Sequence, residues 1–396
     1  MSDPIKKITL RDGTVRWRTV VDAGNDENGK RVQLTITKDT QKEVKEERAR
    51  ITHQRKAGDL IVPSKLTVGE WLDQWLEYKR RDVEETSITT YQLNLLHPRE
   101  RLGHIRLQEL TEDQVQEFVD ELVASGRRSG GKPGTRLAVS TSVVVLNRLR
   151  QALARAVIRK HIATNPAQYV RVSLADKKTD KRDRTRAAPW SVIEVQRFVK
   201  GIERDRLYAP LLLSLMGLRP AEVCGQRWTD IDLKSGAVEI ANTRTMIGNV
   251  RVLEKDTKTS SGERALPLPQ GPLEALKRFK AQQAREKLAA GEGYTDTGYV
   301  AVDELGLPLN TRQLREYAYR LMDSTGLRHV RLYDARHSCL TYLAVNGVPD
   351  VVLAAWAGHT NASFTKRRYV HPGIEDLRSA ATAWDGFHGG AHNPSV

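Results

Sequence analysis

Alternating apolar and polar positions at the start of the chain predict a small antiparallel sheet. Three short strands are expected between residues 5 and 37, with a hairpin turn at Asp12-Gly13 and a second polar connection at residues 24–29. One face would be apolar, formed by Val15, Trp17, Val21, Val32, Leu34 and Ile36. The other face would carry Arg16, Arg18, Arg31, Gln33 and Thr35. A polar helix over residues 41–57, ended by Gly58, is expected to cover the apolar face.

The apolar spacing changes to a helical period after residue 65 and predicts a bundle. Helices are expected from the capping sequence at residues 67–70, over residues 87–96, over residues 111–125 and over residues 141–161. Trp71 and Trp75 fall on one stripe, at a spacing more typical of a core than of a base-stacking platform. The Gly-rich basic segment 126–137 is interpreted as a flexible loop.

Two segments of this region are strongly basic. The outer face of the helix at residues 141–161 carries Arg148, Arg150, Arg155, Arg159 and Lys160. Residues 177–186 hold six cations, two acids and no apolar residue, so they are expected to form an exposed linker; the cations include Lys177, Lys178 and Arg182. Both segments could contact DNA phosphates, and the polar face of the N-terminal sheet could read a groove. A solvated charged or polar face is the alternative in each case.

A third region begins after Pro189 and mixes helices with a few strands. Helices are expected at residues 191–202, 207–218, 272–288, 311–325, 333–346, 350–357 and 373–384. Strands are expected at residues 237–243, 251–254 and 264–268, with residues 260–262 turning between the last two. The fold class predicted for the whole chain is therefore multidomain and mainly α, with small antiparallel sheets.

Composition narrows the kind of partner. The 396 residues include 64 Lys plus Arg against 49 Asp plus Glu, a formal charge of +15, which favours nucleic acid ahead of a membrane surface as partner. A merely basic soluble protein is the alternative. No apolar run has the length of a membrane span, and no signal peptide is recognised. Cys224 and Cys339 lack metal-ligand spacing and are interpreted as buried thiols of an intracellular protein.

Candidate chemistry appears at four places in the third region. Arg219, in Gly-Leu-Arg-Pro-Ala-Glu, precedes a helix started by proline, so its guanidinium could be held toward two phosphate oxygens with Glu222 bracing it. Lys258 lies at a predicted hairpin tip and could donate a proton to a leaving alkoxide. Each has an ordinary alternative: a surface Arg–Glu pair and a solvated lysine.

The other two places lie near the C-terminus. Arg336-His337 begins an apolar helix, whose N-terminus favours an anion. Gly358-His359 follows, and Tyr369 stands ten residues later, directly after three cations at residues 366–368. Taken alone, Tyr369 has the pattern of an ordinary half-buried tyrosine.

Together these motifs have the order and spacing of the tyrosine recombinases, and the chain resembles the phage and mobile-element integrases of that family over nearly its whole length. The resemblance implies an N-terminal arm-type DNA-binding domain at residues 1–62 and a helical core-binding domain at residues 65–174. It further implies a basic linker at residues 175–187 and a catalytic domain with a C-terminal tail at residues 188–396.

The resemblance also implies the reaction, a site-specific DNA cleavage and rejoining without metal or cofactor. Tyr369 would attack a phosphodiester and form a 3′-phosphotyrosyl link, while Lys258 protonates the leaving 5′-oxygen. The non-bridging oxygens would be bound by Arg219, Arg336 and His359. Tyr333 stands where the family pattern has a histidine, and a phenol stays neutral near pH 7. Glu222 and His337 would have supporting roles.

Partners follow from the same resemblance. We expect double-stranded DNA with core-type and arm-type sites as the substrate and a homotetramer on that DNA. A host DNA-bending protein and an excision factor are the accessory proteins that the resemblance suggests. The expected location is the cytoplasm of a bacterial host, at the nucleoid. The residues expected to touch DNA outside the catalytic domain are Arg16, Arg18, Arg31, Gln33, Arg148, Arg155, Arg159, Lys177, Lys178 and Arg182. Alternative functions are a type IB topoisomerase-like enzyme and a DNA-binding regulator with altered catalysis.

Overall fold

The computed structural model describes residues 5–25, 31–183, 189–247, 251–256 and 263–359. The chain divides into two compact units, Met1–Thr185 and Arg186–Val396. Helices dominate both units, and the sheets are small and antiparallel, which confirms the predicted fold class. Within the described ranges, no helix combines the length and apolar character needed to cross a membrane.

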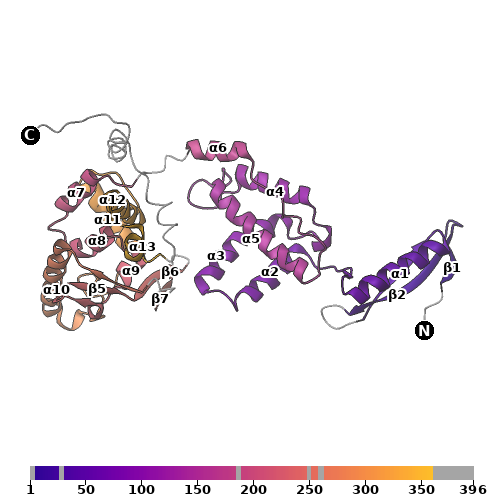
Figure 1. The fold of residues 1–396 in the computed structure, drawn as a ribbon, viewed down its shortest axis with the longest axis horizontal. Coiled ribbons are helices and arrows are strands. Elements are labelled where there is room, and N and C mark those ends of the chain that lie inside the picture. Colours follow the sequence, from indigo (N-terminus) through magenta and orange to yellow (C-terminus); the bar gives the residue numbers. More distant parts are fainter. Residues whose placement is uncertain (1–4, 26–30, 184–188, 248–250, 257–262, 360–396) are drawn as a thin grey trace, which may run out of the picture. The chain divides into compact units, whose positions relative to one another are not determined.

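A three-stranded sheet and one helix form the N-terminal part of the first unit (Figure 1). The strands are β1 (Lys6–Thr9), β2 (Val15–Asn25) and β3 (Arg31–Lys38), and α1 (Gln41–Ala57) packs on their apolar face. The connection predicted at residues 24–29 begins too early in the sequence, because Gly24 and Asn25 still pair with β3. A bulge between Asp22 and Gly24 lets the ladder continue.

Four helices with one hydrophobic core follow: α2 (Val68–Lys79), α3 (Glu85–Leu102), α4 (Glu112–Ser125) and α5 (Val139–Ile158). Trp71 and Trp75 are core residues, as predicted, and Trp71 Nε1 donates to the Ala152 carbonyl at 2.9 Å. Helix α3 continues past the expected end at residue 96 and contains Pro98. The burial of Pro98 and Leu102 offsets the backbone hydrogen bond that the proline cannot make.

The basic segment that follows is partly helical. Helix α6 (Leu174–Asp183) occupies most of the expected linker, and Arg136 ties its first turn to the bundle by an ion pair with Asp176 at 3.1 Å. Lys177 and Lys178 are exposed, as predicted. The side chain of Arg182 and residues 184–188 lie outside the described part. The predicted linker is therefore helical up to residue 183.

In the described part of the second unit, helices and two small β elements surround a large hydrophobic core. Its helices are α7 (Val192–Gly201), α8 (Tyr208–Leu215), α9 (Pro220–Gly225), α10 (Gln270–Ala290), α11 (Thr311–Ser324), α12 (Leu332–Val345) and α13 (Asp350–Ala357). A three-stranded sheet has the order β4 (Ile231–Asp232), β5 (Ala237–Ile240) and β8 (Arg264–Pro267). A separate hairpin consists of β6 (Asn242–Ile247) and β7 (Arg251–Asp256).

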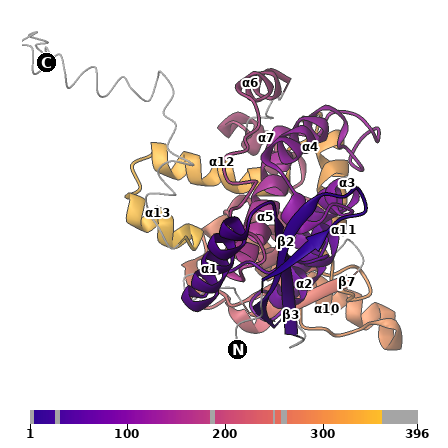
Figure 2. The same cartoon turned by 90° about the vertical axis from the view of Figure 1, so that its right-hand side faces the viewer.

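This arrangement corrects the expected strands. The single strand predicted at residues 237–243 is divided, since Ala241 separates β5 from β6 and the two pair in different sheets. The predicted turn at residues 260–262 and helix at residues 373–384 lie outside the described residues. Helices α12 and α13 lie side by side (Figure 2), and Leu340, Leu353 and Ala357 form a small core between them.

The two cysteines lie in the interior of the second unit. Cys224 is fully buried, as expected, whereas Cys339 is only partly covered. Burial raises the pKa of both thiols to about 12. Neither is therefore a thiolate near neutral pH, which leaves them as packing residues.

Candidate active site

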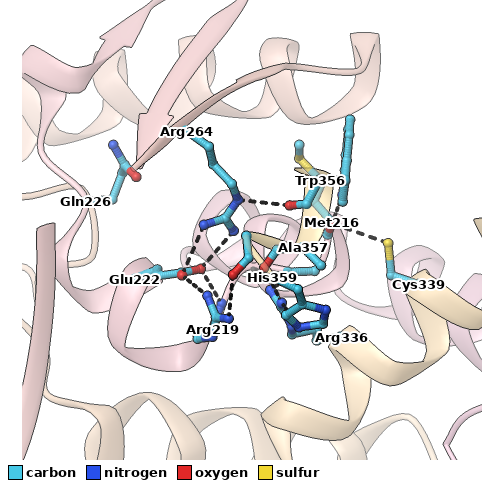
Figure 3. Close-up of polar contacts among 12 residues, drawn as sticks. Met216, Arg219, Glu222, Gln226, Arg264, Arg336, Cys339, Trp356, Ala357 and His359 are labelled. Atoms are coloured by element: carbon cyan, nitrogen blue, oxygen red, sulfur yellow. Dashed lines mark hydrogen bonds and ion pairs between the residues drawn. The ribbon is translucent and has the colours of Figure 1, made fainter. Parts of the chain in front are cut away.

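Arg336 is the centre of the described site. It lies in the second turn of α12 and is completely buried. Its Nη1 donates to the Gly217 carbonyl at 2.5 Å, and its Nη2 donates to the Ala357 carbonyl and to His359 Nε2, the latter at 3.0 Å (Figure 3). One guanidinium thus joins the segment before Arg219, the end of α13 and His359.

Backbone conformation makes these acceptors available. Gly217 has φ +101°, a region that favours glycine, and it turns the chain from α8 into the Arg219 segment. Gly358 has φ +60° and caps α13 in the left-handed conformation. Its carbonyl accepts a hydrogen bond from Arg219 Nη2 at 3.2 Å. The predicted motifs at residues 217–219 and 358–359 therefore meet across the fold.

Glu222 lies between two arginines and is almost completely buried (Figure 3). Its carboxylate accepts from Arg219 Nη1 at 2.6 Å, which confirms the predicted brace, and from the Arg219 backbone nitrogen at 2.8 Å. It also accepts from Arg264 at 3.1 and 3.2 Å. Burial disfavours the charged carboxylate, but the hydrogen bonds and charges of Arg264 and Arg219 outweigh it and hold the Glu222 pKa below its usual value.

Arg264 is the site residue that sequence reasoning missed. It begins β8, is largely buried, and donates from Nε to the Trp356 carbonyl at 2.9 Å besides binding Glu222. A lone arginine at the start of a short strand carries no local signal of burial. Its role appears only where β8, α9 and α13 come together.

His359 is neutral in this environment. Burial lowers its pKa to about 4, helped by the neighbouring positive charges of Arg336, Arg219 and Arg264 and opposed by Glu222. Because a guanidinium can only donate, His359 Nε2 accepts from Arg336, and the ring proton of the neutral imidazole is on Nδ1. The cluster thus combines three guanidinium groups with one carboxylate and carries a net positive charge, as a site for an anion requires.

Tyr333 and His337 lie one turn apart on α12. Their rings pack edge to face with centroids 5.1 Å apart, and Tyr333 is 38% exposed while His337 is buried. The phenol therefore stands at the surface beside a buried histidine. Lys258 and Tyr369, the expected proton donor and nucleophile, lie outside the described residues.

The N-terminal residues expected to contact DNA are partly engaged within the sheet. Arg16 pairs with Asp39 at 2.9 Å and Arg31 with Asp22 at 3.2 Å, both at the surface. Arg18 Nε donates to Thr37 Oγ1 at 3.2 Å, and Gln33 is exposed. Surface pairs of this kind are weak, so the side chains could exchange them for other partners.

The basic face of α5 is less uniform than predicted. Arg150 is structural, since its Nε and Nη2 donate to the carbonyls of Ala167 and Val170 at 2.9 and 2.8 Å. Arg148 and Arg155 are half-buried against aromatic rings, whereas Arg159 is exposed. The helix predicted to residue 161 ends at Ile158, and Lys160 already has a positive φ, so Arg159 and Lys160 lie beyond α5. The five cations therefore share neither one helix nor one kind of surroundings.

Removing the Arg264 guanidinium is expected to destabilise the second unit. In Arg264→Gln, Glu222 keeps its charge but loses its most buried partner, which should lower the free energy of unfolding by about 3 kcal/mol. Chemical denaturation measures this change. The double variant with Glu222→Gln should recover part of it, and Arg278→Gln, at an exposed position on α10, is the control. An Arg264→Gln protein as stable as the parent would contradict the proposed ion-pair role.

Neutrality of His359 is also measurable. The imidazole is expected to remain neutral at pH 6, where an unperturbed histidine of pKa about 6.5 is largely protonated. Because the folded pKa is below the unfolded one, this group should lower stability as the pH falls from about 6.5 to about 4. Nitrogen NMR of histidine-labelled protein gives the titration, and His359→Gln identifies the signal. A midpoint near 6.5 would refute the buried, cation-flanked environment.

Comparison with known proteins gives consistent matches over both units. Residues 194–375 match the phage integrase family, and residues 67–123 match the N-terminal SAM-like domain of phage integrases. A tyrosine recombinase XerC-like protein of Caldanaerobacter subterraneus subsp. tengcongensis is 25% identical over 378 residues, which cover 91% of this chain and 94% of that protein. An integrase of Streptomyces ambofaciens is 24% identical, covering 94% of this chain and 93% of the relative.

Solved structures show the same fold. The Tn1549 transposon integrase in complex with a circular intermediate DNA matches 81% of this chain and 99% of that chain, with TM-score 0.65 and 19% identity. A lambda integrase dimer bound to a COC′ core site matches 94% of this chain and 99% of that chain, with TM-score 0.55 and 15% identity.

Proposed function

This chain belongs to the phage integrase family of tyrosine recombinases, and from that premise we propose that it is a site-specific DNA recombinase of a phage or mobile element. The observation that carries the proposal is the convergence of Arg219, Arg336 and His359 from three distant segments on one buried cationic cluster. Such a cluster suits a phosphodiester anion and the charge that grows on it during displacement.

The proposed roles follow from these contacts. Arg219, partly exposed and braced by Glu222, would bind a non-bridging phosphate oxygen directly. Arg336 is buried and directed at protein acceptors, so an arriving phosphate oxygen would replace His359 Nε2 as the acceptor of its Nη2. The negative charge of the phosphate would raise the imidazole pKa, so that His359 could take up a proton at Nε2 and donate it in a hydrogen bond to the phosphate. This scheme is supported by the hydrogen bonds described above, which hold the side chains of Arg219, Arg336 and His359 near one another.

The remaining steps are assigned to residues beyond the described site. Tyr369 would attack phosphorus and expel the 5′-oxygen, leaving a 3′-phosphotyrosyl ester, while Lys258 gives a proton to that oxygen. The ester keeps the energy of the broken bond, so the 5′-hydroxyl of a new strand can restore the backbone without ATP. Tyr333 would contribute a neutral hydrogen bond where the family pattern has histidine, and His337 would support it by packing.

The domains are proposed to divide the recognition of DNA. Residues 1–62 would bind arm-type sites and residues 65–174 core-type sites, joined by the basic linker at residues 175–187 to the catalytic domain at residues 188–396. A homotetramer on DNA, with a host DNA-bending protein and an excision factor as accessories, completes the assembly. Support comes from the solved lambda integrase tetramer bound to a Holliday junction, which has TM-score 0.54 to this chain and 15% identity.

A plasmid assay tests the proposal against its alternatives. A supercoiled plasmid with two attachment sites, taken from the DNA flanking the gene, should yield recombinant circles with the purified protein. A type IB topoisomerase-like enzyme would relax plasmids that lack the sites and give no recombinants. A regulator would bind the sites without breaking either strand, and that result would overturn the proposed function.

A further inference from the structure

We propose that Tyr78 and Tyr91 are positioning residues that hold Arg155 and Arg148 as a two-point clamp for the DNA backbone. The inference rests on the proposed function. It specifies how one face of the helical bundle would bind the DNA substrate. The clamp consists of two tyrosine–arginine stacks that join α5 to α2 and α3.

The first stack rests against the bundle core. The Arg148 guanidinium carbon lies 3.4 Å from the centroid of the Tyr91 ring, close enough for full stacking. Tyr91 is in turn stacked on the buried Trp75, with centroids 5.8 Å apart and planes 24° apart. Arg148 Nη1 also donates to Gln151 Oε1 at 2.6 Å. The guanidinium plane is therefore fixed by a rigid aromatic pair.

The second stack lies two helical turns further along α5. The Arg155 guanidinium carbon is 4.4 Å from the centroid of the Tyr78 ring at the end of α2. The Nε atoms of both arginines are buried and make no hydrogen bond to any residue in the described part. With Nε against the protein and Arg148 Nη1 bonded to Gln151, the groups left to bind a partner in the described structure are Arg148 Nη2 and the two terminal nitrogens of Arg155.

Charge distinguishes these two arginines from their neighbours. Within the described residues, neither guanidinium has a carboxylate partner, whereas Arg99, Arg101 and Arg128 of the same bundle are ion-paired with Asp73, Glu121 and Glu100. A stacked guanidinium keeps its full positive charge and loses little rotamer freedom on binding. Because no carboxylate of the described residues neutralises them, the two guanidinium groups can bind anions.

Spacing favours a polymer of phosphates over a single anion. Residues seven apart on a helix lie on one face, about 10 Å from each other along the axis. No one phosphate can bridge that distance, but two phosphates of a DNA backbone can. Contacts of this kind do not read sequence, so the clamp is expected to set affinity and register rather than specificity.

A double-mutant cycle tests the coupling within each stack. The probe is a labelled duplex of about 30 base pairs with arbitrary sequence, titrated with full-length protein at several salt concentrations. Arg148→Gln should weaken binding and lower the salt dependence by about one phosphate contact. Tyr91→Leu should weaken binding about three- to fivefold, the range of a stacking interaction, yet cause no further loss in the Arg148→Gln background.

Matched variants separate positioning from folding. Tyr91→Phe keeps the ring and should bind like the parent. Tyr78→Leu in the Arg155 pair avoids the Trp75 stack, so its effect does not depend on the core. Tyr169→Leu, at a tyrosine that is 68% exposed on the bundle, is the control and should change nothing.

The outcomes distinguish the clamp from the proposed function. Additive losses in both cycles, or unchanged binding by Tyr78→Leu and Tyr91→Leu, would overturn the clamp while leaving the recombinase proposal intact, provided that the parent still recombines the two-site plasmid. A parent that recombines nothing but shows the expected coupling would support the clamp and refute the recombinase. A parent that binds no duplex would overturn both.

Discussion

A Tyr369→Phe variant is expected to form no covalent complex with a nicked suicide substrate that traps the parent protein. Phenylalanine lacks the phenolic oxygen that would attack phosphorus, so the loss should be complete within the sensitivity of the assay. The free pKa of tyrosine is about 10, which means that the phenol depends on nearby cations to become a nucleophile at neutral pH. Denaturing electrophoresis of labelled DNA, which separates free from protein-linked strands, measures the effect.

Two controls make the result specific. Tyr369→Phe should bind the same duplex as tightly as the parent, because only one oxygen has been removed. Tyr342→Phe, at a position on α12 that is 50% exposed, should trap DNA normally. Trapping by Tyr369→Phe at the parental level would show that another residue is the nucleophile.

Arg336→Lys is expected to lower the rate of strand cleavage by about a hundredfold to a thousandfold, the usual cost of losing one charge-stabilising donor. Lysine keeps the positive charge but not the planar fork that reaches the Gly217 and Ala357 carbonyls and His359 together. At least one buried carbonyl would lose its donor, so stability should fall by about 2 kcal/mol as well. Single-turnover cleavage and chemical denaturation measure the two effects.

The control for Arg336→Lys lies at the start of the same helix. Arg331 has a side chain that is 70% exposed and pairs with Asp334 at 2.9 Å, so Arg331→Lys should cleave DNA at close to the parental rate. If Arg336→Lys cleaved as fast as Arg331→Lys, the proposed charge stabilisation by Arg336 would be wrong. Cleavage measured well below the unfolding midpoint keeps the loss of stability from being mistaken for a catalytic effect.

Local signals accounted for most element boundaries. Capping residues with a reciprocal partner three positions later, such as Thr67 with Glu70 and Ser191 with Glu194, mark helix starts in the structure as they do in the sequence. The predicted limits of α1 match because Thr40 and Gly58 satisfy its two ends. Where no such signal exists, as at Ala241 between β5 and β6, the prediction was wrong.

For the candidate site, the sequence identified the motifs but not their contacts. The pairing of Arg219 with Glu222 was predictable, because residues three apart at a helix start are neighbours. The burial of Arg336, its bond to His359, and the presence of Arg264 beside Glu222 were not predictable. These features join residues more than 20 positions apart, and no local pattern specifies which distant carbonyl or carboxylate will face a given arginine.

Sequence alone therefore determined the class of this protein: its helical periods, its basic charge, and an ordered series of Arg, Lys, His and Tyr motifs that resembled one family. Tertiary structure decided the role of each cation. Arg150 is structural, Arg148 and Arg155 are stacked on tyrosines, and other arginines meet at the candidate site. The physical reason is range. Periodicity and capping depend on neighbours within a turn or two, whereas desolvation and charge pairing depend on whatever the fold brings within a few ångströms.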